Sequence, residues 1–432
     1  MKGFTSPAIE PARGEPLSPP DGRTTEVDVL VIGSGPGGSA AAYHLARHGV
    51  DVLVVDKASF PREKVCGDGL TPRGVRAVQR MGVDATEAGF IRVEGLRVYG
   101  PTVTLNLPWP KLERFPDFGV VRTRHDFDHL LAQRAIKAGA RVWERTEALA
   151  PLVDRSWVVG ARVRREGGED ETVRARFVVA ADGASSRFAQ KAGVRRDPTR
   201  PLGVAARRYY RSPREQGTYL ESWFDLLEGG VILPGYGWIF PVGDGILNVG
   251  AGLLNTTKMF KEISPRRMLD TFVAHLPPDW EIGEETAAGP VLSGPLPMGM
   301  NRRPLALPGL LVVGDAGGLV NPFTGEGIAY AMETGELAAE LVHDAMASGR
   351  PGLAHTYPLV LRRRYARYFT AGRAFAKAIG NPRIMRYSVL HGFPRERLMR
   401  FALRLLANLS DGPQGDLDDR VMDWLVRISP ER

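Results

Sequence analysis

The sequence predicts an α/β protein in which a parallel-sheet domain is joined to a separate antiparallel-sheet domain and a helical C-terminal region. Three observations indicate this architecture. Near the start of the chain a buried strand, a glycine-rich turn, a helix and a second strand follow one another, which is the order of a βαβ unit. Short aromatic strands dominate from Leu202 to Leu253, and residues 353–432 have helical patterns broken at Gly380, Pro382 and Gly392.

The parallel-sheet domain begins with Val27–Ile32, an apolar run without alternation that is typical of a strand buried on both faces. Residues 37–48 fit a helix, and Asp51–Val55 fits the next strand. The elements expected later in this domain are the helices 72–81 and 126–138, the strand 141–143, a hairpin of 157–164 and 172–180, the strand 310–313 and a long helix over 325–346.

The antiparallel-sheet domain is expected to form the wall of a pocket. Its candidate strands are 207–210, 219–224, 237–240 and 246–250. We therefore divide the chain into a flexible leader (1–25), a discontinuous first domain (26–95, 118–200 and 303–350), a substrate-binding sheet domain (96–117 and 201–302) and a basic helical region (351–432).

Size and composition limit the possible classes of protein. The 432 residues suffice for two or three domains, and 43% hydrophobic with 25% charged residues is typical of a globular chain rather than a disordered one. Cys66 is the only cysteine, which excludes an internal disulfide and fits a reducing, cytoplasmic compartment. No run of uncharged apolar residues is long enough to span a membrane, and we expect no metal site.

The glycine-rich turn Gly33-Ser34-Gly35-Pro36-Gly37-Gly38 follows a strand and opens a helix, as a dinucleotide fingerprint requires. Gly33 permits the tight turn, Gly35 lets the backbone approach a pyrophosphate, and Gly38 allows close helix–strand packing. Asp56 closes the second strand, where a carboxylate can accept hydrogen bonds from ribose hydroxyls. The alternative is a glycine-rich turn without a ligand.

A second cluster favours FAD over a nicotinamide cofactor. Gly314 and Asp315 end the strand 310–313, and Gly325-Glu326-Gly327-Ile328 opens the long helix. Asp315 would bind the ribityl hydroxyls of an extended FAD, although an acid here can also cap a helix. The positive end of the long helix would stabilise the negative charge of a reduced flavin.

Three weaker positions agree with this cofactor. Arg124 begins a helix and is either a phosphate contact or a surface arginine. Asp182 follows an apolar run and is either a cofactor contact or part of a strand-ending turn, and Ala148 follows a strand where backbone can touch adenine. The complete set of predicted FAD contacts is Gly33, Gly35, Pro36, Gly37, Gly38, Asp56, Lys57, Cys66, Gly67, Gly69, Arg124, Ala148, Asp182, Gly314, Asp315, Gly325, Gly327 and Ile328.

Two motifs carry a family resemblance that covers the chain from about Asp28 to Leu409. Tyr236-Gly237-Trp238-Ile239-Phe240-Pro241 and Cys66-Gly67-Asp68-Gly69 resemble the Y-x-W-x-F-P and C-G-x-G segments of the geranylgeranyl reductase family, flavoproteins that saturate isoprenoid double bonds. The resemblance implies a Rossmann-type FAD domain of the glutathione-reductase/p-hydroxybenzoate-hydroxylase type. It also implies FAD contacts from Asp56, Cys66, Gly67, Gly69, Arg124, Asp315, Gly327 and Ile328.

The stretch 60–73 is most similar to the actinobacterial branch of this family, which is associated with menaquinone. The resemblance thus implies an FAD-dependent reductase of C=C bonds in a prenyl chain, either the menaquinone side chain or a geranylgeranyl lipid or diphosphate. The rival enzyme class is a flavin-dependent monooxygenase or halogenase of the same fold. Halogenases carry W-x-W-x-I-P, from which Tyr236 and Phe240 depart. A flavin-holding sensor or membrane scaffold is the non-enzymatic alternative.

Tyr236, Trp238 and Phe240 alternate along one strand and are expected to share a face. With Pro241 they would bind the prenyl chain, or they would form an ordinary aromatic core stripe. Cys66 and Tyr236 are the candidate catalytic proton donors, and the alternative for Cys66 is packing or flavin positioning. No second nucleotide fingerprint is present, so NAD(P)H would visit the flavin transiently, or a ferredoxin-like carrier would reduce it.

Positive charge is concentrated between Leu361 and Ser410. This segment holds twelve Lys and Arg residues and one acid, Glu396, a net charge of +11 in a chain of net +8. Its apolar residues recur at near-helical spacing, which favours amphipathic helices in peripheral contact with an anionic membrane. A solvated basic face is the alternative, and nucleic-acid binding is not expected because no recognised reading module accompanies the charge.

Overall fold

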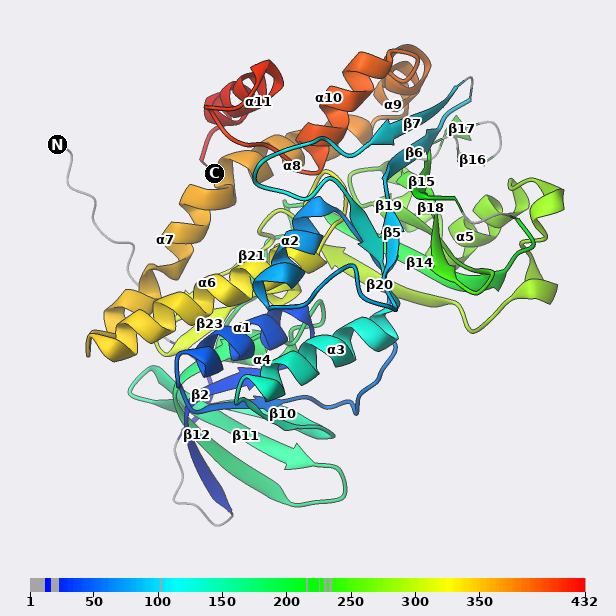
Figure 1. The fold of residues 1–432 in the computed structure, drawn as a ribbon. Helices are drawn as coiled ribbons and strands as arrows, with labels where there is room; N and C mark the ends of the chain where they lie inside the picture. Colours follow the sequence, from blue (N-terminus) through cyan, green and yellow to red (C-terminus); the bar gives the residue numbers. More distant parts are fainter. Residues whose placement is uncertain are drawn as a thin grey trace.

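The computed structural model describes residues 12–16, 23–101, 103–214, 217–224, 226–228, 231–232 and 235–431. Its larger sheet has parallel strands at the centre and an antiparallel hairpin at one side (Figure 1). In sheet order the strands are β1 (Glu15–Pro16), β10 (Thr146–Asp154), β11 (Trp157–Arg165), β12 (Asp170–Ala180), β2 (Thr24–Ile32), β3 (Val52–Val55) and β9 (Arg141–Trp143), with β23 (Leu310–Val312) beside β12 and β22 (Ala306–Leu307) beside β23.

Apolar residues at the centre of this sheet explain its parallel arrangement. Val29, Leu30 and Val31 of β2 are fully buried, as are Leu53 and Val54 of β3, so both faces of these strands are covered. The covering helices are α1 (Pro36–Arg47), α2 (Pro72–Arg80), α3 (Arg124–Lys137), α4 (Arg187–Ala192) and α6 (Ile328–Ala347). The predicted hairpin is confirmed, since β11 and β12 pair antiparallel.

The second sheet is a mainly antiparallel, seven-stranded layer drawn from two separate chain segments. Its order is β20 (Leu292–Pro297), β14 (Leu202–Arg211), β19 (Ile246–Leu254), β18 (Gly235–Gly243), β15 (Tyr219–Trp223), β6 (Gly95–Tyr99) and β7 (Thr104–Pro108). Helix α5 (Pro265–Ala274) covers one face, where Phe272 packs beneath Gly237. The other face of β18 therefore remains for contact with the first domain.

Smaller strand groups lie outside the two main sheets. They are β4 (Gly69–Leu70), β8 (Gly119–Val121) and β5 (Ile91–Val93) in one sheet, β13 (Arg195–Arg196) with β21 (Arg302–Arg303), and β16 (Leu227–Glu228) with β17 (Val231–Ile232). The proposed domain boundaries at residues 95–96 and 200–202 lie close to the starts of β6 and β14.

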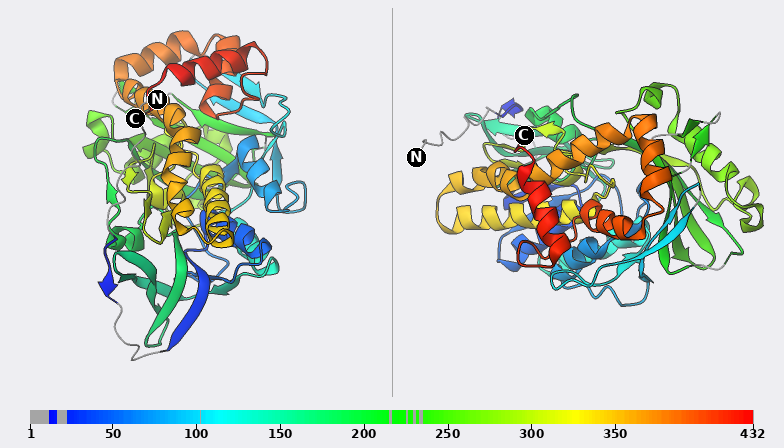
Figure 2. Two further views of the ribbon diagram at one scale, coloured as in Figure 1. Left: turned by 90° about the vertical axis from the view of Figure 1, so that its left-hand side faces the viewer. Right: turned by 90° about the horizontal axis from the view of Figure 1, so that it is seen from above.

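The C-terminal region is helical, as predicted, and lies at the end of the molecule opposite the β10–β12 strands (Figures 1 and 2). Its helices are α7 (Tyr357–Leu361), α8 (Arg367–Ile379), α9 (Pro382–Tyr387), α10 (Glu396–Leu406) and α11 (Leu417–Ile428), with π-helical turns over Arg362–Ala366 and Ser388–Gly392. None of the described helices combines the length and apolar character needed to traverse a bilayer.

Part of the flexible leader predicted over residues 1–25 is paired with the larger sheet. Glu15 and Pro16 pair in parallel with Leu152 and Val153 of β10, and Glu15 forms an ion pair with Arg162. Strand β2 already begins at Thr24, before the predicted Val27. Two residues are too short a strand to show periodicity, so the sequence gives no sign of β1. Residues 1–11 and 17–22 lie outside the described part.

A buried ionic cluster holds the C-terminal region against the first domain. Arg73 of α2 donates to Glu333 of α6 at 2.8 Å, and Tyr365 donates to the same carboxylate at 2.6 Å. Arg73 also donates to the Asn408 carbonyl and lies over the Tyr330 ring. These contacts engage both Nη atoms of a guanidinium that is only 8% exposed, while its buried Nε has no partner among the described residues.

Removing one partner of this cluster should destabilise the fold strongly. We expect Glu333→Ala to lower the free energy of unfolding by about 3–5 kcal/mol, because it leaves Arg73 charged, buried and unpaired. Glu396→Ala, which breaks the exposed ion pair with Arg400 on α10, should cost within about 0.5 kcal/mol. Urea unfolding of the two variants measures the difference, and equal losses would contradict the assignment.

Candidate active site

The glycine-rich turn after β2 has a shape that only glycine allows. Gly33 has a φ of 98°, and a Cβ there would lie 2.6 Å from the Ala181 carbonyl oxygen. A Cβ on Gly38 would lie 1.8 Å from the Gly33 carbonyl oxygen. Helix α1 starts at Pro36 with Gly35 as its N-cap, so its first amides have no partner within the helix. The turn therefore presents free N–H groups suited to phosphate.

Asp56 lies against this turn, at the end of β3. Its carboxylate is buried and accepts hydrogen bonds from the Ser34 amide at 2.7 Å and the Ala58 amide at 2.9 Å. Lys57 next to it is exposed. Ala148 lies in β10 and packs against the core cluster that contains the β3 residues. Asp56 therefore lies beside the glycine-rich turn, and its predicted contact to the ribose stays a prediction, while the contact predicted for Lys57 gains no support from its position.

One buried carboxylate holds two arginines, of which Arg62 lies beside the turn. Asp128 of α3 accepts from Arg124 at 2.6 and 2.7 Å, and Arg62 Nη1 lies 3.1 Å from Asp128 Oδ2. Arg62 Nη2 is 3.7 Å from the position of a Cβ on Gly35, so its charge lies over the phosphate-binding turn. Sequence analysis identified Arg124 but missed Arg62, although Arg62 stands in the family-like stretch 60–73.

Asp182 follows β12, and one of its carboxylate oxygens has a structural role. Its Oδ2 accepts from the Phe188 amide at 2.8 Å and so holds the start of α4. Its Oδ1 is buried and has no partner among the described residues. Burial raises the pKa of Asp182 to about 6. Both alternatives for Asp182 thus find support, since it lies in a strand-ending turn and keeps one oxygen for a ligand.

Asp315 lies in a short 3-10 turn after β23, where Gly314 has a φ of 56°. Its carboxylate accepts no hydrogen bond within the described part of the chain, and burial raises its pKa. A Cβ on Gly327 would lie 3.2 Å from Asp315 Oδ1, a tight contact, so the start of α6 lies directly beside the acid. Lys64 interacts electrostatically with Asp315. Burial lowers the pKa of Lys64, and the negative charge of Asp315 offsets this only in part.

The long helix α6 begins at Ile328, three residues later than predicted. Gly327 is its N-cap, and Gly325 has a φ of 80°, a left-handed conformation that belongs to a turn. The position of a Cβ on Gly325 is 3.9 Å from the Tyr236 hydroxyl. The positive end of α6 therefore lies close to the aromatic strand.

The Cys66–Gly69 loop packs directly on that strand. A Cβ on Gly67 would lie 2.9 Å from Phe240 Cε2 and 3.2 Å from Trp238 Nε1, and one on Gly69 would lie 3.1 Å from Phe240 Cε2. The ring centroids of Tyr236 and Trp238 are 6.0 Å apart, and those of Trp238 and Phe240 are 6.4 Å apart. The prediction that these three rings share one face is confirmed.

Pro241 is the exception in this motif. It is buried in β18, and strand alternation turns it to the side of Gly237 and Ile239, away from the three rings. Its predicted substrate contact therefore gains no support from its position.

A network centred on Asp68 connects the loop to the second sheet, and the sequence did not reveal it. Asp68 is fully buried, and its Oδ2 accepts from the Tyr209 hydroxyl at 2.6 Å and from Asn248 Nδ2 at 2.7 Å. Asn248 also donates to the Cys66 carbonyl and accepts from Trp238 Nε1 at 3.0 Å. The network fixes the loop and the aromatic rings relative to each other.

These features fit FAD. The turn at Gly33–Gly38 supplies free amides for a pyrophosphate, with Arg62 beside it. Asp315, without a hydrogen-bond partner in the described chain, can accept hydrogen bonds from hydroxyls.

Comparison with known proteins gives the same result. Residues 26–214 match the family described as FAD binding domain. The chain is 36% identical to a menaquinone reductase of Mycolicibacterium smegmatis, over 94% of this chain and 95% of the relative. It is 32% identical to a digeranylgeranylglycerophospholipid reductase of Thermoplasma acidophilum, over 79% and 84% of the two chains.

Among solved structures, a geranylgeranyl bacteriochlorophyll reductase-like protein from Thermoplasma acidophilum superposes with a TM-score of 0.72 at 26% identity, over 88% of this chain and 100% of that chain. This chain belongs to the geranylgeranyl reductase family. It is an FAD-dependent oxidoreductase. The flavin-dependent brominase Bmp2 has a TM-score of 0.70 at 20% identity, over 93% and 98% of the two chains, and shares the fold alone.

In this geranylgeranyl reductase family member, both predicted proton donors keep their protons at neutral pH. Burial raises the pKa of the Cys66 thiol, and Arg124 opposes this only in part. Burial also raises the pKa of Tyr236 to about 12, and its hydroxyl donates to the Thr324 carbonyl at 2.8 Å. The Tyr236 proton is therefore engaged by the backbone.

Glu326 is a third buried acid, which the sequence analysis did not select. Its Oε1 accepts from the Thr71 hydroxyl at 2.8 Å, whereas Oε2 is buried without a partner among the described residues. Burial raises the pKa of Glu326 from 4.5 to about 7. It stands between Gly325 and Gly327, at the start of α6.

The fingerprint can be tested through flavin content. Gly38→Ala should reduce the FAD retained per protein by at least about tenfold, because relieving the contact with the Gly33 carbonyl moves the phosphate-binding turn. Gly352→Ala is the matched control, since a Cβ there meets nothing within 4 Å. Flavin absorbance after purification measures both, and full FAD content in Gly38→Ala would refute the assignment.

Glu326 should make stability depend on pH. A raised pKa favours the protonated folded state, so this contribution to stability is complete below pH 4.5 and is lost as the pH rises to about 7. We expect Glu326→Gln to remove the loss, so that its stability relative to the parent grows by about 2–3 kcal/mol across that interval. Urea unfolding of the holoprotein at several pH values measures this.

The control for this prediction is Glu87→Gln, which changes an exposed glutamate. It should leave the pH profile unaltered. Parallel profiles for the parent protein and Glu326→Gln would show that Glu326 is ionised in the folded state, contrary to the expectation.

Proposed function

We propose that this protein hydrogenates a C=C bond in a prenyl chain, with the menaquinone side chain as the preferred substrate. The observation that carries the proposal is the packing of the Cys66–Gly69 loop on the row Tyr236, Trp238 and Phe240. An apolar wall next to a flavin-site loop is suited to binding an apolar, extended prenyl chain. The similarity to menaquinone reductases along 94% of the chain supports the choice of substrate. A geranylgeranyl lipid or diphosphate is the other candidate.

When bound, FAD supplies the hydride equivalent for such a reduction. The residues of this chain have to do the rest, because an isolated alkene has no carbonyl to polarise it. The three aromatic rings would hold the prenyl chain in a fixed position beside the flavin and exclude water. Both effects raise the reaction rate, because the reacting atoms stay close together in a dry site. A proton must reach the second carbon, and the protonated Cys66 thiol is the candidate donor within the flavin-site loop.

Further partners form part of the proposal. NAD(P)H visiting transiently or a ferredoxin-like carrier would reduce the flavin, because the sequence has a single dinucleotide fingerprint. The substrate tail would reside in a membrane, so we infer peripheral contact of a cytoplasmic enzyme with anionic lipid through the basic segment 361–409.

The reaction can be tested directly. Chemically reduced holoenzyme is mixed without oxygen with menaquinone that has a fully unsaturated side chain, and the quinone is analysed by mass spectrometry. We expect a product that stays heavier by one pair of hydrogen atoms after the quinone ring has been reoxidised in air, because a quinol formed at the ring loses its added hydrogens and a saturated side chain does not. A product that carries oxygen or halogen, formed only in air, would instead indicate the monooxygenase or halogenase alternative, and an unchanged quinone would refute the proposed substrate.

The proton donor can be identified in the same assay. Cys66→Ser should lower the turnover of prenyl saturation by about 100-fold, the lower range for loss of a general acid, while FAD content is kept. Tyr236→Phe is the matched change of the second candidate, and we expect a smaller loss because its hydrogen is donated to Thr324. Near-normal turnover of Cys66→Ser would remove Cys66 as the donor.

A further inference from the structure

Helix α11 presents an apolar stripe to the solvent. Leu417, Val421, Trp424 and Ile428 follow the spacing i, i+4, i+7 and i+11, which aligns them on one side of a helix. Their exposed fractions are 69%, 38%, 58% and 60%. A contiguous row of this kind, with a tryptophan in it, is unusual on a surface that meets only water.

The stripe faces outward because the opposite side of α11 is anchored. Asp419 is 1% exposed and accepts from Arg404 of α10 at 2.7 Å, and Asp416, which caps α11, accepts from Arg404 at 2.7 and 3.1 Å. Arg404 itself is 8% exposed. Acidic side chains thus hold α11 from within, together with Met422, which is 3% exposed, and Val426, which packs against the core, so the stripe is a second apolar side that faces the solvent.

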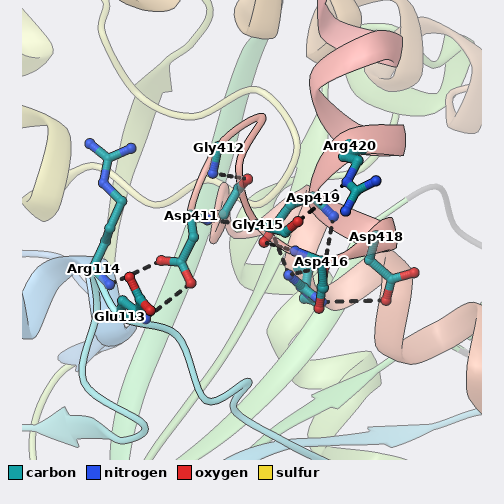
Figure 3. Close-up of polar contacts among 11 residues, drawn as sticks. Glu113, Arg114, Asp411, Gly412, Gly415, Asp416, Asp418, Asp419 and Arg420 are labelled. Atoms are coloured by element: carbon teal, nitrogen blue, oxygen red, sulfur yellow. Dashed lines mark hydrogen bonds and ion pairs between the residues drawn. The ribbon is translucent and has the colours of Figure 1, made fainter.

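The loop before α11 is anchored as well. Figure 3 shows the Asp411 carboxylate turned toward Glu113 and Arg114, whose backbone amides donate to it at 3.0 Å each. The Asp411 amide in turn donates to Asp419 at 3.3 Å. The stripe therefore belongs to a fixed element of the fold.

The neighbouring helices add apolar and basic groups to the same end of the molecule, where Figures 1 and 2 place α9, α10 and α11 together. Ile384, Tyr387 and Leu398 are 43%, 67% and 47% exposed. Exposed arginines without an acidic partner in the described chain stand among them, namely Arg383, Arg386 and Arg397.

We propose that α11, together with α9 and α10, is a docking face for an anionic lipid bilayer, with the stripe of Leu417, Val421, Trp424 and Ile428 entering the headgroup region. Tryptophan and tyrosine suit that region because their rings are apolar and carry a polar tip. The arginines complement anionic headgroups, each adding attraction near the surface. The inference rests on the proposed function, because it explains how the enzyme reaches a substrate whose tail lies in a membrane.

Vesicle binding by the holoenzyme tests this face. The parent protein should co-sediment with vesicles of phosphatidylcholine and phosphatidylglycerol, bind less at high salt, and bind weakly to phosphatidylcholine alone. A variant with Leu417→Ser, Trp424→Ser and Ile428→Ser should bind the mixed vesicles at least about tenfold more weakly, because the apolar insertion is lost. Ile136→Ser on α3, the matched control at an exposed apolar position elsewhere, should bind like the parent.

Flavin content and far-UV circular dichroism of the triple variant establish that it is folded, since the changed positions are exposed. Absence of parent binding to the mixed vesicles, or equal binding by the triple variant, would overturn the proposal. A parent dimer that the triple variant abolishes would also overturn it and assign the stripe to a second copy. Activity on detergent-solubilised menaquinone is read separately, so its absence with intact vesicle binding would refute the proposed reaction and leave the docking face standing.

Discussion

The contact between the Cys66–Gly69 loop and strand β18 is the interaction on which the arrangement of the site depends. The loop belongs to the first domain, whereas β18 belongs to the second sheet. The two segments are far apart in the sequence, so only the fold brings them together. Asp68 is the centre of this contact. It receives hydrogen bonds from Tyr209 and Asn248 of the second sheet and from the Arg124 amide of α3. Leaving such a buried carboxylate unsatisfied would cost several kcal/mol, so the two layers are held in one geometry.

The contact between the loop and β18 also depends on two glycines. Gly67 and Gly69 let the backbone approach the rings of Trp238 and Phe240 more closely than any side chain would permit. At the other end of the site, Gly335 of α6 lies against the Gly37 carbonyl, where a Cβ would come within 2.2 Å. Helix α6 thus packs on the helix that follows the fingerprint, while its own N-terminus lies near Tyr236. The phosphate-binding turn and the aromatic wall are consequently fixed by the same helix.

Local patterns in the sequence predicted much of this molecule. The fingerprint at Gly33–Gly38 and the alternation of Tyr236, Trp238 and Phe240 are short-range signals, because a turn and a strand are specified by adjacent residues. The fold class and the hairpin of β11 and β12 followed from the same kind of signal.

Long-range partners were not predictable in this way. Asp68 and Asn248 are 180 residues apart, and nothing in either segment indicates the other. Arg62 became part of the site only because Asp128, 66 residues later, holds its guanidinium beside Gly35. Strand β1 and the outward stripe of α11 depend on β10 and on Arg404, respectively. An amphipathic pattern specifies which side of a helix is apolar, but not which side the fold turns inward.

Burial gives the site two properties at once. A dry, apolar wall favours a prenyl chain because removing its surface from water is favourable. The same lack of water disfavours every charged form, and this raises the pKa values of Cys66, Tyr236 and Glu326 together. A site that protonates an alkene needs acids that keep their protons until the substrate is in place. In the proposed binding mode the exclusion of water would supply both the affinity for the chain and the protonated state of the acids, so a substitution that admits water at Phe240 or Trp238 would weaken both.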